Sequence, residues 1–488
     1  MHIIDILIFV VYMVAMLGVG FFFFSKNEGT EDYYVGGRKM NSWHIGLSVV
    51  ATDVGGGFSV GLGGLGFVMG LSGSWMLFTG LIGAWLAAVF LIPLVKGNKA
   101  FDKFYTFPQI FGYFYDKKTA LLAGLISAVG YTGFTSSQIL AGAKLASGTF
   151  VDLDMNTALW VMGAVAVIYT VLGGIKAVIY TDTVQWIILM CGLIFIGLPI
   201  AYTAVGGWES IKATVAPEML TFTNISWQDM VNWGVTIIPI WFVAMTLYQR
   251  IYASRDEKTA RKAWFIAGVF EWPIMAFMGV ALGLLAKVGA DQGMFDYLGA
   301  ENVSATDPET GLPMLLRTVL PVGLMGLVMS AYFSAVLSTA DSCLMAASGN
   351  IVSDLLCKIF PINENGKSFL VISQGVTFIL GVLAVGLAWK MTNVLNLMLY
   401  SYAFLVSGLL IPILGALFWK KGNSIAAFSS MLTGGCVTVG LSLLIPAEQM
   451  PLGLDANVFG ILGALIIFVT LSYVIPNKQI ENKSLKYS

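Results

Sequence analysis

Long apolar stretches with almost no charge run through most of this sequence, and they limit its possible folds more than any other feature. Only 11% of the 488 residues are Asp, Glu, Lys or Arg, whereas a soluble domain carries about 25%. Because a water-exposed surface cannot be covered with so few charges, most of the outer surface must face lipid. The sequence therefore predicts an all-α integral membrane protein.

Thirteen apolar segments are long enough to be transmembrane helices, which need about 20 residues each. They cover residues 3–25, 44–70, 75–95, 119–149, 156–173, 183–204, 229–249, 262–287, 313–350, 368–389, 393–419, 424–445 and 456–475. An outside N-terminus places most of the 26 Lys and Arg residues in inner loops, Arg250 among them, as the positive-inside rule requires. We therefore expect a multi-pass protein of the plasma or inner cell membrane, with about 13 transmembrane helices and a cytoplasmic C-terminus.

The composition also excludes several classes of function. A net charge of −1 leaves no basic surface for nucleic acid. The four cysteines lie in or beside apolar stretches and form no disulfide or zinc pattern. Neither His2 nor His44 lies in a nucleophile–base arrangement. We therefore expect no enzymatic activity, no organic cofactor and no obligate protein partner.

Two of the predicted spans are interrupted near their middle. In the second span, three consecutive glycines at 55–57 follow Asp53 closely, and each costs about 1 kcal/mol relative to alanine in a helix. In the seventh span, Pro239 removes a backbone donor. Close helix packing explains either interruption alone. Two interruptions five spans apart are instead typical of the binding site of a transporter.

Few ionisable side chains remain inside the predicted spans, where each costs about 2.5 kcal/mol or more. Lys144 lies near the outer end of its span, and we expect it to extend to the lipid headgroups as a structural residue. Glu271 has either a structural or a functional role. The other three residues in this group are Asp53, Asp182 and Asp341.

The ninth predicted span holds the densest group of polar residues. Ser338, Asp341 and Ser342 have i, i+3, i+4 spacing and therefore share one helix face. Hydroxyls, backbone carbonyls freed at a helix break and one carboxylate together suit a monovalent cation. The alternative is that these hydroxyls bond only to their own helix backbone.

Residues 173–185, with the sequence GGIKAVIYTDTVQ, resemble the signature of the sodium:solute symporter family, and further matches lie at 32–38, 106–109, 338–342 and 408–420. The resemblance implies a leucine-transporter-like fold with a 5+5 inverted-repeat core and two broken helices. It also implies sodium-driven import by alternating access. The expected divisions are a first helix and inner loop at 1–41, the ten-helix core at 42–421, two C-terminal helices at 422–476 and a cytoplasmic tail at 477–488.

The resemblance also implies the sodium ligands. The main sodium site would use the backbone carbonyls of Ala51, Val54 and Ala335 and the hydroxyls of Ser338 and Thr339. Family members with a second sodium site build it at the positions of Asp182, Ser338, Asp341 and Ser342, but Asp341 replaces a hydroxyl residue. Two carboxylates near one cation repel each other unless both are neutralised. We therefore expect one or two sodium ions, with a second sodium or a proton at the Asp182/Asp341 locus.

The sequence around the first break is less specific about the substrate. Residues 51–54 are similar to the motif of the family's proline transporters, whereas 54–58 are similar to that of its choline transporters, which have Trp at the position of Asp53. The Asp53 carboxylate can pair with an ammonium group or anchor the sodium site. The predicted substrate-binding residues are Asp53, Gly55, Gly56, Gly57, Phe58, Tyr131, Thr135, Gln138 and Trp241, with Tyr400 or Tyr402.

Together these features predict a sodium-coupled symporter that imports a small polar organic solute, with an amine-bearing, amino-acid-like solute favoured. Its partners would be this solute, sodium ions and the lipid bilayer. Two alternatives stay open. One is a symporter for a sugar or sugar acid, and the other is a channel or sensor-like protein on the same fold.

Overall fold

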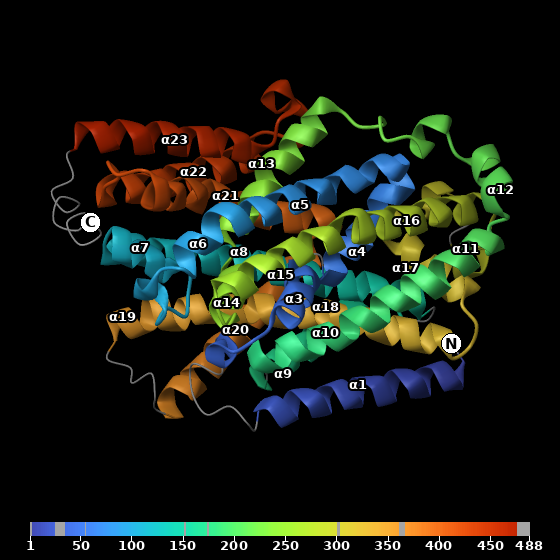
Figure 1. The fold of residues 1–488 in the computed structure, drawn as a ribbon. Helices are drawn as coiled ribbons and strands as arrows, with labels where there is room; N and C mark the ends of the chain where they lie inside the picture. Colours follow the sequence, from blue (N-terminus) through green and yellow to red (C-terminus); the bar gives the residue numbers. More distant parts are fainter. Residues whose placement is uncertain are drawn as a thin grey trace.

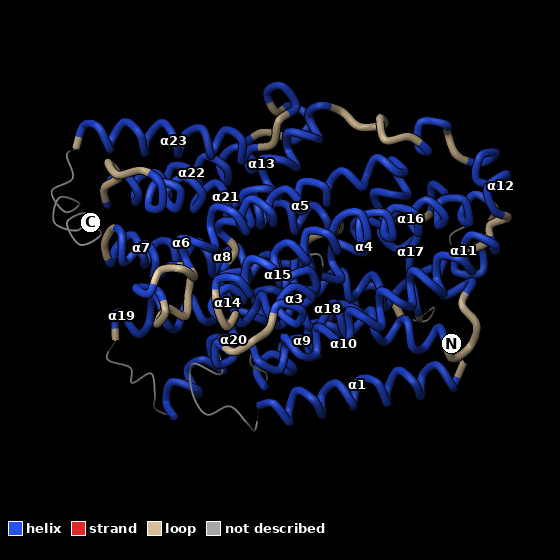
Figure 2. The backbone as a smooth tube through the Cα atoms, viewed as in Figure 1, coloured by secondary structure: helices blue, strands red, loops and turns tan. Residues whose placement is uncertain are grey.

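The computed structural model describes residues 2–24, 35–53, 55–150, 153–172, 175–299, 303–360 and 367–475. Within these ranges the chain consists of helices and connecting loops (Figure 2). The described residues contain one isolated β-bridge, between Met40 and Ser254, and no extended strand. The all-α prediction is therefore confirmed.

Most of the long α-helices overlap the predicted apolar segments, and several short helices lie between those segments. Those of the first half are α1 (Ile3–Phe24), α3 (Ser42–Asp53), α4 (Gly55–Met69), α5 (Trp75–Leu86), α6 (Ile92–Val95), α7 (Pro108–Phe114), α8 (Lys117–Thr149), α9 (Met155–Leu172), α10 (Ile175–Gly192), α11 (Leu198–Ala204), α12 (Gly207–Thr214), α13 (Trp227–Val243) and α14 (Met245–Ala253). Those of the second half are α15 (Glu257–Val269), α16 (Ala276–Asp291), α17 (Pro308–Val319), α18 (Leu324–Gly349), α19 (Cys357–Ile359), α20 (Lys367–Lys390), α21 (Val394–Phe418), α22 (Ser424–Leu444) and α23 (Ala456–Val474).

Nine helical segments within the described ranges are long and apolar enough to cross a membrane, or up to ten when the bent pair α13–α14 is counted as one span. Helices α1 and α9 contain shorter apolar stretches. The predicted span 313–350 is wrong at its start, because α17 is a separate helix and α18 begins only at Leu324. Gly323, whose φ of +91° is in the left-handed region, separates the two helices.

Most of the long helices run side by side in one bundle (Figure 1). Helix α1 lies at one edge and contacts α10 and α18, whereas α22 and α23 pack together at the other edge against α21. Helices α3, α8, α10 and α18 lie between these edges. The described chain begins at one end of the bundle and α23 ends at the opposite end (Figure 1).

Lys144 on α8 is a structural residue, but it does not extend to the headgroups. Its side chain is only 5% exposed, and Nζ lies 2.6 Å from Asp307 and 2.7 Å from Glu309. Glu309 also accepts hydrogen bonds from the backbone amides of Val394 and Leu395 at the start of α21. These contacts connect α8, α17 and α21, so the lysine charge is compensated inside the protein and has no need of the headgroups.

Candidate functional site

The second predicted span is interrupted at the position that the glycine run indicates. Helix α3 ends at Asp53 and α4 begins at Gly55, while Val54 lies outside the described residues. Gly55 has a φ of +46°, and a Cβ added there would lie 2.6 Å from Thr339 Oγ1. A Cβ on Gly57 would collide with the Gln138 side chain. Glycine is therefore required here for backbone conformation and for close contact with α8 and α18.

The seventh predicted span is bent by 42° between α13 and α14. The bend is at Ala244, whose ψ of 113° is extended, and not at Pro239, which lies inside α13. The predicted position of this break is therefore wrong by five residues. A membrane helix can continue through a proline when neighbouring groups satisfy the carbonyl that the proline leaves unpaired. Here the backbone departs from helical geometry only at Ala244, beyond Pro239.

Helix α8 satisfies one backbone amide at each break. Gln138 Oε1 accepts a hydrogen bond from the Gly57 amide at 2.9 Å, and Tyr131 Oη accepts one from the Thr246 amide at 3.2 Å. Residues 131 and 138 are seven apart, so both side chains lie on one face of α8. The two predicted substrate ligands therefore stabilise the broken helices, which would otherwise leave unpaired N–H groups in the membrane. The Thr135 hydroxyl donates to the Tyr131 carbonyl of its own helix.

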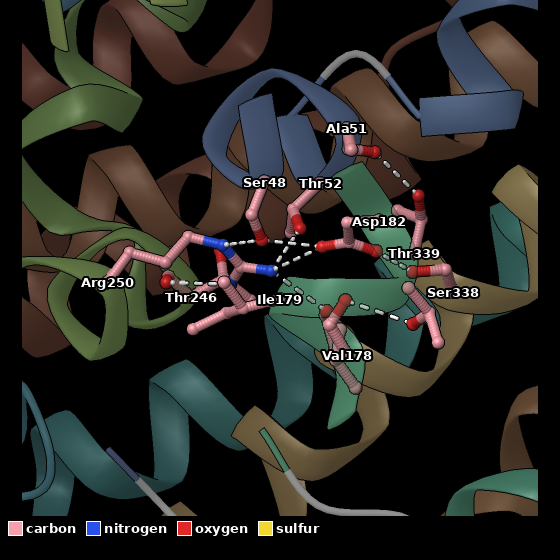
Figure 3. Close-up of polar contacts among 12 residues, drawn as sticks. Ser48, Ala51, Thr52, Val178, Ile179, Asp182, Thr246, Arg250, Ser338 and Thr339 are labelled. Atoms are coloured by element: carbon pink, nitrogen blue, oxygen red, sulfur yellow. Dashed lines mark hydrogen bonds and ion pairs between the residues drawn. The ribbon is translucent and has the colours of Figure 1, made fainter. Parts of the chain in front are cut away.

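Three of the predicted main-site sodium ligands converge beside the first break. Thr339 Oγ1 lies 2.9 Å from the carbonyl oxygen of Ala51 (Figure 3). It also lies 3.0 Å from the carbonyl oxygen of Ala335. We call these three residues the Thr339 cluster. The fourth predicted ligand, Ser338, directs its hydroxyl to the carboxylate of Asp182. The Thr339 cluster offers only neutral oxygens, the donor type that unwound helices present to sodium.

The guanidinium group of Arg250 contacts two of the four residues predicted for the second cation site, Asp182 and Ser342. Arg250 and Asp182 both have fully buried side chains, and Arg250 Nη2 lies 3.3 Å from Asp182 Oδ2. The same guanidinium donates to the hydroxyls of Ser48 and Thr52 and to the Thr246 carbonyl (Figure 3). It also donates to the hydroxyl of Ser342. We call Arg250, Asp182, Ser48, Thr52 and Ser342 the Arg250 cluster.

The assignment of Arg250 to an inner loop is therefore wrong. Helix α14 continues to Ala253 and packs against α3 and α18, which brings Arg250 into the interior. The signal that could have identified it is Asp182 itself, because a buried carboxylate needs a compensating charge. Asp341 lies apart from this hydrogen-bond network. It is fully buried, and neither of its carboxyl oxygens has a hydrogen-bond partner among the described residues.

Asp53 lies at the end of α3 and is 4% exposed. Its Oδ1 accepts a hydrogen bond of 3.0 Å from the Tyr402 hydroxyl on α21. Its carboxyl group also faces that of Glu271, in the kinked helical segment Phe270–Met275 between α15 and α16. Beyond this mutual contact, Asp53 Oδ2 and both Glu271 oxygens have no hydrogen-bond partner in the described ranges. Asp53 and Glu271 are thus two adjacent buried carboxyl groups, and neither forms an ion pair with a described Lys or Arg.

The other predicted substrate residues lie elsewhere or are not described. Tyr400 is 53% exposed and borders a separate cavity of about 260 Å³ with Asn396 and Asn457, so Tyr402 is the tyrosine that reaches Asp53. Trp241 is fully buried. Its ring packs edge-to-face against Trp264 and also lies close to Gly83. The surroundings of Gly56 and of the Phe58 side chain lie outside the described part of the structure.

The fold, with two broken helices and buried polar clusters beside them, defines a class of protein, a multi-pass secondary transporter. The profile of the sodium:solute symporter family matches residues 33–434. The chain belongs to this family and is a sodium-coupled symporter of a small solute, not an enzyme.

Among curated proteins, the chain is similar to the high-affinity proline transporter PutP of Bacillus subtilis, with 27% identity covering 97% of this chain and 99% of that protein. It is also 28% identical to the osmoregulated proline transporter OpuE of Bacillus subtilis, over 88% of each chain. A sodium/proline symporter of Staphylococcus aureus is 25% identical, over 95% of this chain and 91% of that protein.

Two solved structures show the same fold at low sequence identity. A substrate-bound, outward-open sodium-coupled sialic acid symporter has a TM-score of 0.78 and 20% identity, covering 98% of this chain and 99% of that one. The nucleobase-cation-symport transporter Mhp1, in a closed conformation, has a TM-score of 0.56 and 11% identity, over 94% and 99% of the two chains.

Proposed function

We propose that this protein imports a small amine-bearing solute of amino-acid type, proline or a close analogue, together with sodium. The observation that carries this proposal is Asp53, a buried carboxylate at a helix break that contacts the Tyr402 hydroxyl and the Glu271 carboxyl but forms no ion pair with a described Lys or Arg. A substrate ammonium group would compensate this charge. Three of the similar proteins are proline transporters, which supports the same substrate class.

The break also offers a complement for a substrate carboxylate. Helix α4 begins at Gly55, two residues after Asp53 in the chain. The N-terminus of a helix carries free N–H groups and a partial positive charge. Only the Gly57 amide of this first turn is bound by a described side chain, that of Gln138. A zwitterion would thus find a negative group and a positive helix end side by side, whereas an uncharged sugar would use neither charge.

We assign the coupling ion to the Thr339 cluster, with Val54 and Ser338 as the remaining ligands. Ala51 and Asp53 lie two residues apart at the end of α3, so sodium at the carbonyl of Ala51 would hold the backbone that presents Asp53 to the substrate. This proximity gives a physical basis for coupling, because each bound species stabilises the backbone that the other requires.

We also propose the finer architecture from the sequence analysis, with 13 spans and a 5+5 inverted-repeat core at 42–421. The two breaks five spans apart support this division, which leaves 1–41, 422–476 and 477–488 outside the core. The described chain starts at one end of the bundle and α23 ends at the opposite end (Figure 1). This arrangement supports an odd number of membrane crossings. The positive-inside rule then places the N-terminus outside and the C-terminus in the cytoplasm.

A ligand screen on the purified protein tests the substrate class. Thermal unfolding would be followed in sodium and in potassium, with proline, other amino acids, choline, glucose and sialic acid. We expect stabilisation by proline or a close analogue only in sodium, and loss of this shift in Asp53→Asn. Stabilisation by sugars or sialic acid alone would contradict the proposal, as would a shift that is equal in both salts.

A further inference from the structure

We propose that the Arg250 guanidinium is a built-in cation that takes the place of a second sodium ion, so that the protein binds one sodium ion per transport cycle. The inference rests on the proposed function, because it assumes that sodium binds at the Thr339 cluster. It replaces the expectation of a second sodium or a proton at Asp182.

The first argument is the hydrogen-bond inventory of Asp182. Its Oδ2 accepts from Ser48 at 2.5 Å and from Arg250 at 3.3 Å, and its Oδ1 accepts from Ser338. Both carboxylate oxygens are therefore already bonded by buried donors. A sodium ion at Oδ2 would have to displace the guanidinium or the Ser48 hydroxyl, and one at Oδ1 would have to share that oxygen with the Ser338 hydroxyl beside the guanidinium charge.

The second argument is the set of atoms around the guanidinium. Arg250 bonds to the hydroxyl oxygens of Ser48 at 3.0 Å and Ser342 at 3.2 Å, to that of Thr52, and to the carbonyl oxygen of Thr246 at 3.1 Å. Hydroxyl, carbonyl and carboxylate oxygens are the ligands that a sodium ion would require. Here the same oxygens accept hydrogen bonds from an arginine, which stays protonated at any physiological pH.

The third argument is the position of the Arg250 cluster beside the Thr339 cluster. Ser48 and Thr52 lie on the same helix as Ala51, and Ser342 lies one turn beyond Thr339 on α18. A permanent positive charge 3.3 Å from Asp182 opposes a further monovalent ion at that carboxylate, whereas its pairing with Asp182 reduces the repulsion on an ion at the Thr339 cluster. The guanidinium also connects α14 to α3, α10 and α18, so its charge cannot leave without a rearrangement of α14.

The test counts sodium ions in purified wild-type protein and in Arg250→Gln, using equilibrium binding of radioactive sodium and the Hill coefficient for sodium in solute uptake. We expect one ion and a Hill coefficient of about 1 for the wild type. Arg250→Gln leaves Asp182 without its cation, and we expect it to bind a second ion. The double variant Asp182→Asn/Arg250→Gln should return to one ion. Arg255→Gln is the matched control, because the Arg255 side chain is 73% exposed and, among the described residues, pairs with its neighbour Asp256.

Two sodium ions in the wild type would overturn the proposal, even if every variant failed to fold. A folded Arg250→Gln that binds a single ion would also overturn it. The complete absence of sodium binding by the wild type would contradict the proposed function itself, which distinguishes that failure from failure of the present inference.

Discussion

Replacing Thr339 with valine removes the hydroxyl that lies between the carbonyl oxygens of Ala51 and Ala335, at 2.9 and 3.0 Å, while keeping the shape of the side chain. If this hydroxyl is a sodium ligand, its loss should cost about 1.5–3 kcal/mol, the usual range for a polar contact to a charged group. Because about 1.4 kcal/mol corresponds to tenfold in affinity, sodium affinity should fall by about 10- to 100-fold.

The assay is the sodium dependence of solute uptake in proteoliposomes, measured at a fixed solute concentration. We expect a higher half-saturating sodium concentration for Thr339→Val. The matched control is Thr149→Val, the same substitution on α8, where the hydroxyl donates to the carbonyl of Leu145 in its own helix at 2.6 Å. An unchanged sodium dependence in an active Thr339→Val protein would refute the assignment of the sodium site to this cluster.

Two further predictions concern stability in detergent. Gln138→Leu leaves the buried Gly57 amide unpaired, and we expect the free energy of unfolding to fall by about 1–3 kcal/mol, seen as a lower melting temperature. An unchanged melting temperature would show that another group satisfies this amide. Lys144→Met leaves the Glu309 carboxylate without its cation and should cost about 3–5 kcal/mol, whereas Arg261→Met, which breaks an exposed pair, should change stability by about 0.5 kcal/mol or less. Equal effects of these two substitutions would contradict the structural role of Lys144.

Features fixed by nearby residues could be predicted from the sequence. The interruption between Asp53 and Gly55 follows from three adjacent glycines, whose cost in a helix is local. The convergence of Ala51, Ala335 and Thr339 came from the family resemblance, since the carbonyls of α3 and the hydroxyl of α18 are far apart in the chain. No local pattern in the sequence connects them.

Features that depend on contacts between distant helices could not be predicted. Pro239 marks a helix weakness, but the bend at Ala244 also depends on Tyr131 of α8, which binds the amide of Thr246. In the sequence, Arg250 follows an apolar segment and therefore resembles a loop residue. The packing of α14 against α3 and α18 places it in the interior instead. Its pairing with Asp182 joins residues of different helices, and hydropathy carries no information on such pairs.

The most direct test of the account is solute accumulation driven by a sodium gradient. Proteoliposomes containing the wild type or Asp53→Asn would be given radiolabelled proline with an inward gradient of either sodium or potassium. We predict accumulation above the external proline concentration only for the wild type in sodium, since Asp53 is the proposed partner of the substrate amine. Equal uptake in sodium and potassium, or undiminished accumulation by Asp53→Asn, would contradict the account.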